Sequence, residues 1–141
     1  MKKNLFHTAL CLCLVAALTV HFFPATTAFA ATCRTSACDY VDPYGTTCWN
    51  DAVNAVIHYA STMYNINKYS SGCVANWSYV QNTNTTKYLG AETVGISQYD
   101  DPKHQLYAWN SMWDGTGTVC TRGHMGPSAG NYNVNTTSAC A

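Results

Sequence analysis

Charged residues are scarce in this chain of 141 residues: Asp, Glu, Lys and Arg together make up 10% of it, and the formal net charge is zero. After residue 30, five basic and seven acidic residues remain, which is a net charge of −2 with histidine neutral. The chain has no stripe of Lys and Arg, so we expect no binding to nucleic acid. It also has no cationic amphipathic segment that would hold it on an anionic membrane.

Phenylalanine is absent after residue 29, although this part of the chain keeps all four Trp and all ten Tyr residues. Every aromatic ring there therefore carries a hydrogen-bonding N–H or O–H group. Such rings suit half-buried positions, and they also suit faces on which a ring stacks on a sugar or a protein partner. The composition leaves two interpretations open: rings at the edge of a small core, or an exposed binding face.

The first thirty residues have the pattern of a secretory signal peptide. Two lysines precede the apolar run 9–20, and Ala28 and Ala30 are small residues at the two positions that signal peptidase inspects. The run is shorter than the roughly 20 apolar residues of a membrane span. We expect a Sec-type signal peptide over 1–30, cleaved near Ala30, and a single secreted domain over 31–141 without a membrane anchor.

Six cysteines follow residue 30, and an even number in a short exported chain is typical of a disulfide framework. Zinc knuckles and redox motifs would need C-x-x-C or C-x-x-H spacings, which are absent there, so we expect neither a metal nor another cofactor. We favour a disulfide between Cys120 and Cys140, because it would hold the tail (126–141), which has few apolar side chains to bury. The other four cysteines pair among themselves in an order that the sequence leaves open: Cys33, Cys38, Cys48 and Cys73.

The pattern along the chain predicts a mainly β fold. Runs rich in aromatic and β-branched residues, separated by Asn, Thr, Gly and Asp-Pro clusters, predict strands within 75–80, 87–99 and 105–113. Segment 51–64 fits both a helical face behind an Asp cap and the alternation of a strand. We therefore expect a small disulfide-stapled domain, sandwich or barrel-like, with one short helix as an option near 51–60.

A turn is predicted inside the first cysteine-rich loop. Asp42-Pro43-Tyr44-Gly45 has Pro at the second position of a β-turn, where its fixed φ is suitable, and Asp at the first position, where its side chain accepts from the backbone. The residues of segment 32–47 are mostly small, polar or turn-forming, which is typical of a loop held by disulfides.

One sequence pattern resembles the nucleophile motif of hydrolases. Residues 126–130 read G-x-S-x-G around Ser128, but no Asp, Glu or His follows this serine to complete a triad in the order that the hydrolase fold requires. We interpret the segment as a loop.

Carboxylates and histidines supply a second set of candidates. Asp100, Asp101 and Glu92 could in principle form a carboxylate pair for glycoside hydrolysis. Neighbouring side chains of an extended segment point to opposite faces, however, so Asp100 and Asp101 cannot both serve one site. Three histidines lack metal-binding spacing: His58, His104 and His124. We therefore expect no catalytic residue.

Tryptophans are the candidate binding residues. Trp109 and Trp113 are four residues apart in a predicted strand and would share one of its faces, and Trp77 lies in another predicted strand. We predict that these three residues form an aromatic binding face.

Residues 33–52 (CRTSACDYVDPYGTTCWNDA) and 69–80 (YSSGCVANWSYV) resemble a family of exported bacterial proteins known as domain of unknown function 2690. The family pattern has three cysteines, an Asp-Pro pair and a Tyr-Ser-x-x-Cys-x-x-x-Trp signature, and the chain matches it with Cys33, Cys38, Asp42-Pro43, Cys48, Tyr69-Ser70, Cys73 and Trp77. Tyr40-Val41 and Cys140 depart from that pattern. The resemblance implies a small secreted β-rich domain, sometimes appended to bacterial regulators, and no established activity.

These observations favour a non-catalytic binding module of the bacterial extracellular space or cell envelope. Its expected partner is a cell-wall polysaccharide or another extracellular protein. Two alternatives stay open: a small glycan-directed hydrolase, which would need acid, base or nucleophile groups converging in a cleft, and an inhibitor or toxin-like effector that presents the braced loop 38–48 to a partner.

Overall fold

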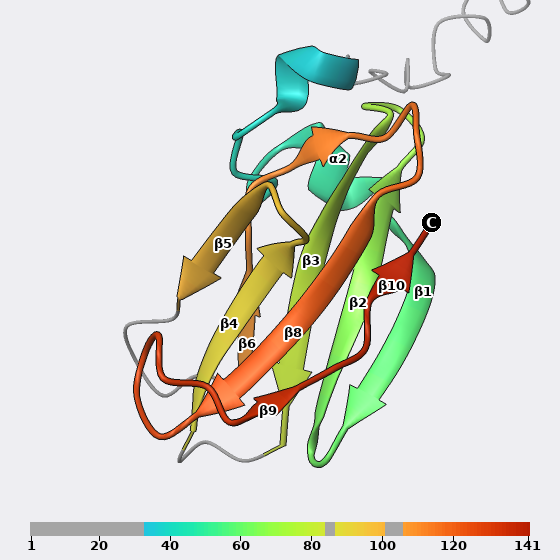
Figure 1. Ribbon diagram of the computed structural model, residues 1–141. Helices are drawn as coiled ribbons and strands as arrows, with labels where there is room; N and C mark the ends of the chain where they lie inside the picture. Colours follow the sequence, from blue (N-terminus) through green and yellow to red (C-terminus); the bar gives the residue numbers. More distant parts are fainter. Residues whose placement is uncertain (1–32, 84–86, 101–105) are drawn as a thin grey trace, which may run out of the picture.

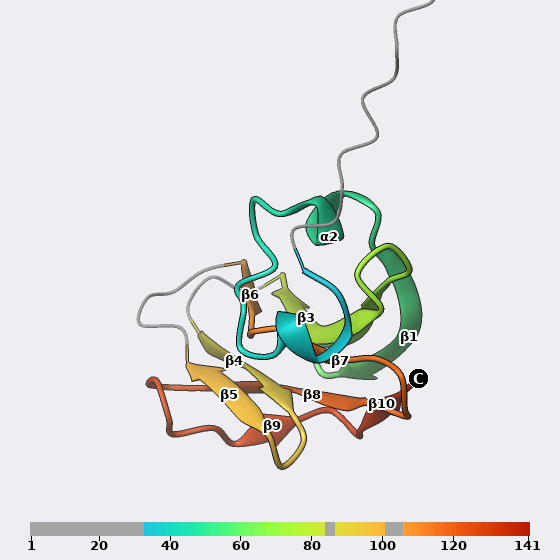
Figure 2. The same cartoon turned by 90° about the horizontal axis from the view of Figure 1, so that it is seen from above.

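Two antiparallel sheets pack face to face in this computed structural model, which describes residues 33–83, 87–100 and 106–141 (Figures 1 and 2). The mainly β prediction is confirmed. The described strands form a sandwich and do not close into a barrel. The predicted signal peptide lies outside the described residues.

The first sheet has the strand order β1-β2-β3-β6, and β7 pairs with the beginning of β3, before the part that pairs with β6. Its strands are β1 (Val53–Ala60), β2 (Met63–Ser70), β3 (Ala75–Asn82), β6 (Tyr107–Trp109) and β7 (Trp113–Asp114).

The second sheet has the order β10-β8-β4-β5, and β9 also pairs with β8. Its strands are β4 (Tyr88–Thr93), β5 (Ser97–Asp100), β8 (Cys120–Gly126), β9 (Val134–Asn135) and β10 (Ala139–Cys140). The predicted strand run 87–99 is thus the β4–β5 hairpin.

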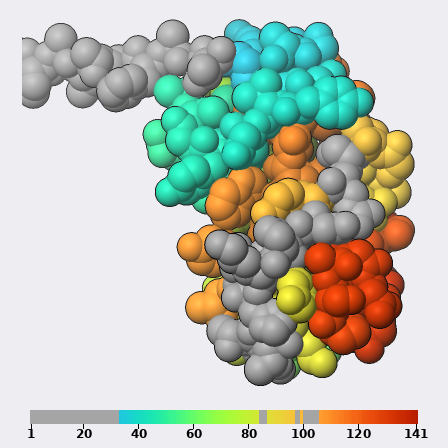
Figure 3. Space-filling model, turned by 90° about the vertical axis from the view of Figure 1, so that its left-hand side faces the viewer, coloured from blue at the N-terminus to red at the C-terminus, as the bar shows by residue number. Residues whose placement is uncertain are grey.

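The segment before β1 forms a cap over one end of the sandwich, visible as the cyan and teal residues of Figure 3. It contains the 3₁₀ helix η1 (Thr35–Cys38) and the short α-helix α2 (Thr47–Asn50). The ambiguous segment after Asp51 is a strand, because it pairs with β2 along its length, and the short helix lies immediately upstream. Within the described residues, no helix is long and apolar enough to cross a bilayer.

The predicted turn in the cap lies one residue further along. The amide of Thr46 donates to the Pro43 carbonyl over 3.1 Å, so Pro43 is the first residue of the turn. The shift has a physical reason, because Gly45 has a φ of +76° and occupies the third position, where glycine is favoured. Asp42 accepts from the Tyr44 amide over 2.9 Å, as an Asp before a turn commonly does.

The described residues contain three disulfides, as predicted: Cys33–Cys38, Cys48–Cys73 and Cys120–Cys140. The favoured bridge to Cys140 is confirmed, and the four earlier cysteines do pair among themselves. Cys38, Cys48 and Cys73 are fully buried and form one core cluster with Ala75, Trp77 and Met112. The Cys48–Cys73 bridge therefore fixes the cap to the turn between β2 and β3.

Asparagine side chains join the two sheets. Asn67 on β2 donates to the carbonyls of Val119 (2.7 Å) and Ala139 (2.9 Å), and Asn65 donates to the Thr121 hydroxyl over 3.0 Å. These groups are fully buried but satisfied, so the usual penalty for burying an amide is offset. A second apolar cluster also packs between the two sheets: Met63, Val80, Leu89, Ala91, Ala108 and Met125.

Candidate binding groove on the outer face of the first sheet

Side-chain alternation along β3 determines which residues face away from the second sheet. Ser78 points inward, because its hydroxyl donates to the Arg122 carbonyl of β8 over 3.2 Å. Trp77 and Tyr79 therefore point outward. Tyr79 lies opposite Trp109 of β6 in the strand register, which places Trp109 on the same outer face.

Four rings follow one another across this outer face. Tyr79 stacks on Tyr107 (centroids 6.4 Å apart), Tyr107 on Trp109 (5.9 Å), and Trp109 on Tyr44 from the cap (5.3 Å). The indole N–H of Trp109 donates to Asp42 over 2.9 Å, which fixes its orientation. Tyr44 and Tyr107 are 63% and 45% exposed, so the row reaches solvent.

Trp49 of helix α2 joins this row to the core. Its ring meets Trp109 and Tyr79 edge-on, with centroids 5.3 and 5.8 Å away, and stacks on Trp77 at 6.2 Å. Helix α2 presents Trp49 in this place because Thr46 caps the helix and Cys48 is bonded to Cys73. Trp77 lies beneath and is fully buried.

A hollow of about 350 Å³ lies beside the row of rings, a size within the range of small-molecule sites. We call it the outer groove and define it by its lining residues: Trp49, Ala52, Asn54, Tyr64, Ile66, Lys68, Trp77, Tyr79 and Gln81. The lining alternates aromatic rings with amide, hydroxyl and ammonium groups, and it contains no Asp or Glu.

Burial perturbs two ionisable groups of the outer groove. The Lys68 ammonium lies 5.5 Å from the centre of the Tyr79 ring, and burial lowers the pKa of Lys68 below its ordinary value of 10.5. Burial also raises the pKa of Tyr79 above 10.0, and the neighbouring hydroxyls of Tyr64 and Tyr107 raise it further. Tyr79 therefore keeps its hydroxyl proton at neutral pH.

The structure does not bring the three predicted tryptophans together. Trp109 belongs to the outer face, whereas Trp77 is buried under α2. Trp113 lies opposite Asn76, whose side chain points inward to Asn67, so Trp113 faces the opposite side of the sheet from Trp109. Its ring packs against Tyr40 (centroids 5.5 Å apart) and lines a separate hollow near the second sheet.

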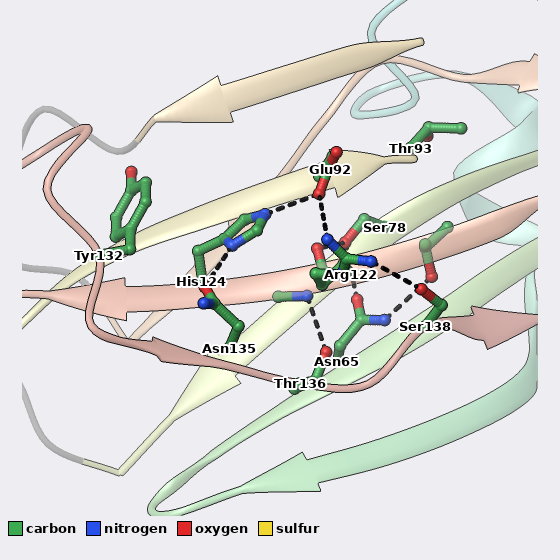
Figure 4. A network of polar contacts seen from close by, with 12 residues as sticks. Asn65, Ser78, Glu92, Thr93, Arg122, His124, Tyr132, Asn135, Thr136 and Ser138 are labelled. Atoms are coloured by element: carbon green, nitrogen blue, oxygen red, sulfur yellow. Dashed lines mark hydrogen bonds and ion pairs between the residues drawn. The ribbon is translucent and has the colours of Figure 1, made fainter. Parts of the chain in front are cut away.

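The second sheet carries a polar cluster on its own surface (Figure 4). His124 lies between Glu92 (Nε2 to Oε2, 2.9 Å) and Asn135 (Nδ1 to Oδ1, 2.7 Å), and Tyr132 stacks on its ring. Arg122 reaches the same Glu92 oxygen at 3.8 Å. Both nitrogens of His124 are therefore engaged within the cluster. The cluster ties β9 to β8 and β4.

The other sequence candidates that the structure describes belong to different parts of the fold. Ser128 is an exposed residue in the turn after β8, and no helix follows it. His58 contacts the Thr137 hydroxyl at 2.6 Å. Asp101 and His104 lie outside the described residues, so the acidic pair that the sequence suggested with Glu92 is not placed.

Four cysteine sulfurs also lie close together, within 4.8 Å of one another: those of Cys33, Cys38, Cys48 and Cys73. Zinc binds thiolates, and these sulfurs are paired in two disulfides. The arrangement explains instead how one compact sulfur cluster fixes the cap.

Sequence reasoning missed most residues of the outer groove. A usable signal exists in the alternation Tyr64-x-Ile66-x-Lys68 on β2 and Trp77-x-Tyr79-x-Gln81 on β3, which places these six side chains on one face once the strands pair. The contribution of Trp49 needs the long-range Cys48–Cys73 bond. Comparison of the chain with protein-family models, curated proteins and solved structures found no match.

Proposed function

We propose that the protein is a secreted, non-catalytic module that binds a polysaccharide of the bacterial cell envelope in the outer groove. The observation that carries this proposal is the lining itself: the rings of Trp49, Tyr64 and Tyr79 stand beside the polar groups of Asn54 and Gln81. A sugar has C–H faces that pack on aromatic rings and hydroxyl groups that bond to amides. Both kinds of partner are available within one hollow.

The contacts that hold the side chains of the outer groove in place also suit a binding role. The rings contact one another, Trp109 is held by Asp42, and α2 is bonded to the core through Cys48. Side chains that are ordered before binding lose little conformational entropy when the ligand arrives. Rigid rings on a disulfide-braced sheet therefore favour recognition of an extended, weakly hydrophobic chain.

Binding is favoured over hydrolysis because glycoside hydrolysis ordinarily uses two carboxyl groups on either side of the bond. The lining of the outer groove has none. The three disulfides and the predicted signal peptide support an extracellular location. The resemblance to domain of unknown function 2690 stays a prediction, and it agrees with a secreted β-rich protein.

Co-sedimentation with purified insoluble cell-wall polysaccharide tests the proposal. We expect wild-type protein to enter the pellet and Tyr64→Ala and Gln81→Ala to remain largely in the supernatant. Tyr99→Ala is the matched control, because this tyrosine is 41% exposed on the second sheet. Equal pelleting of the two groove variants and wild type, or no pelleting of any protein, would contradict the proposal.

A further inference from the structure

We propose that the polysaccharide is acidic and that Lys68 binds a carboxylate on one of its sugar rings. This inference deepens the proposed function and rests on it. It names the chemical class of the ligand and the residue that selects it.

Lys68 is placed in the outer groove by the strand register. It lies opposite Asn54 of β1 and Trp77 of β3, on an inner strand of the first sheet. Its side chain is half-buried, and its ammonium lies 5.5 Å from the centre of the Tyr79 ring. A cation held over an aromatic face keeps its position while one side remains available to a ligand.

No anion of the protein compensates Lys68 in the described part of the chain. The ion pairs there are those of Glu92 with Arg122 and His124, on the second sheet. Asp51, close to the end of β2, accepts from the Ser70 hydroxyl and the Gly72 amide. Partial burial of an uncompensated charge is unfavourable, so an incoming anion would gain a charge-assisted bond without breaking an existing ion pair.

The neighbours of Lys68 favour a carboxylated sugar over a phosphate polymer. Trp49, Tyr64 and Tyr79 offer ring surfaces to the ligand, and Gln81 and Asn54 offer amides. A uronic or muramic acid unit carries a carboxylate on a pyranose ring and can use all of these groups. A glycerol phosphate chain has the charge but no ring to pack on the aromatic walls.

Calorimetric titration with three probes tests this assignment: a hexuronic acid oligosaccharide, its carboxyl-reduced counterpart with the same linkages, and poly(glycerol phosphate). We expect wild type to bind the acidic oligosaccharide about tenfold more tightly than the reduced one, the change typical of one charge-assisted hydrogen bond. Lys68→Met should remove this preference, so that the variant binds the acidic and the reduced oligosaccharide equally tightly. Lys68→Arg should retain the preference.

The outcomes separate the two proposals. Equal affinity for the acidic and reduced probes, both weakened by Tyr64→Ala, would overturn the role of Lys68 and leave glycan binding intact. Binding of neither oligosaccharide would overturn both proposals. Binding of poly(glycerol phosphate) as tightly as the acidic oligosaccharide would also overturn the assignment, because charge alone would then suffice. The two sources of the carboxylate are a uronic acid and muramic acid. Titration with a peptidoglycan fragment that contains muramic acid distinguishes them.

Discussion

The indole of Trp49 stacks on the indole of Trp77 with ring centroids 6.2 Å apart, and this contact anchors helix α2 to the floor of the outer groove. A helix of four residues is too short to be stable by itself. Its position therefore depends on the Thr46 cap, the Cys48–Cys73 bond and the buried face of Trp49. Stability of the cap and integrity of the outer groove are consequently linked.

Removal of the Cys48–Cys73 bridge should cost more stability than removal of Cys33–Cys38. The two bridges span 25 and 5 residues, and the loop-entropy relation gives about 3.5 and about 2 kcal/mol respectively. Urea unfolding of Cys48→Ala/Cys73→Ala and of Cys33→Ala/Cys38→Ala measures both. Cys48→Ala/Cys73→Ala should also lose binding in the outer groove. Equal losses of stability in the two double variants would contradict this ranking.

Trp109→Ala should weaken polysaccharide binding roughly fivefold, equivalent to about 1 kcal/mol. Trp109 is not in the lining, but it packs on Trp49 and Tyr107 and so keeps the neighbouring rings in place. Trp113→Ala is the matched control, because Trp113 faces the opposite side of the sheet. Titration of both variants with one oligosaccharide tests the difference, and a larger effect from Trp113→Ala would contradict the assigned face.

Asn67→Ala should destabilise the fold by about 3 kcal/mol or more, because several buried groups would lose their hydrogen bonds at once. Asn67 donates to the carbonyls of Val119, just before β8, and of Ala139 on β10. Its side-chain oxygen accepts from the Asn76 amide over 2.8 Å. Denaturant unfolding gives the free energy. Asn133→Ala, at an exposed position in the turn before β9, should change it by less than about 0.5 kcal/mol.

Lys68→Met should raise the melting temperature at pH 7, and the difference from wild type should shrink as the pH approaches 10.5. Burial lowers the pKa of Lys68 in the folded state, so between that pKa and 10.5 the unfolded chain binds more protons and the stability of wild type rises with pH. The raised pKa of Tyr79 has the opposite effect above pH 10.0, but it is common to both proteins. Thermal melts from pH 7 to 10 measure the difference, and a gap that does not depend on pH would contradict the buried-cation account.

The strands could be predicted from sequence because aromatic and β-branched residues between turn-forming clusters describe local preferences. The Cys120–Cys140 bridge could be favoured because the tail has little else to hold it. Segment 51–64 could not be assigned, since its helical and strand patterns fit equally well. Pairing of β1 with β2, a tertiary interaction, decides the matter.

The candidate site was harder to predict. The expectation that Trp109 and Trp113 share a face assumes one continuous strand, but β6 and β7 pair with β3 in registers that differ by one residue. Trp109 lies opposite Tyr79 and Trp113 opposite Asn76, and a shift of one residue turns a side chain to the other face of the sheet. Trp77 has the alternation of an outward-facing residue, and the cap covers it. That covering depends on a disulfide between residues 25 positions apart, which local patterns do not reveal.

Amide chemical shifts recorded during titration with a hexuronic acid oligosaccharide locate the binding site residue by residue. We expect the largest changes in residues 49–54 and in the parts of β2 and β3 around Lys68 and Tyr79. Residues of β8 around His124 should change little. The largest changes on the second sheet, or no changes at millimolar oligosaccharide, would contradict the outer groove as the binding site.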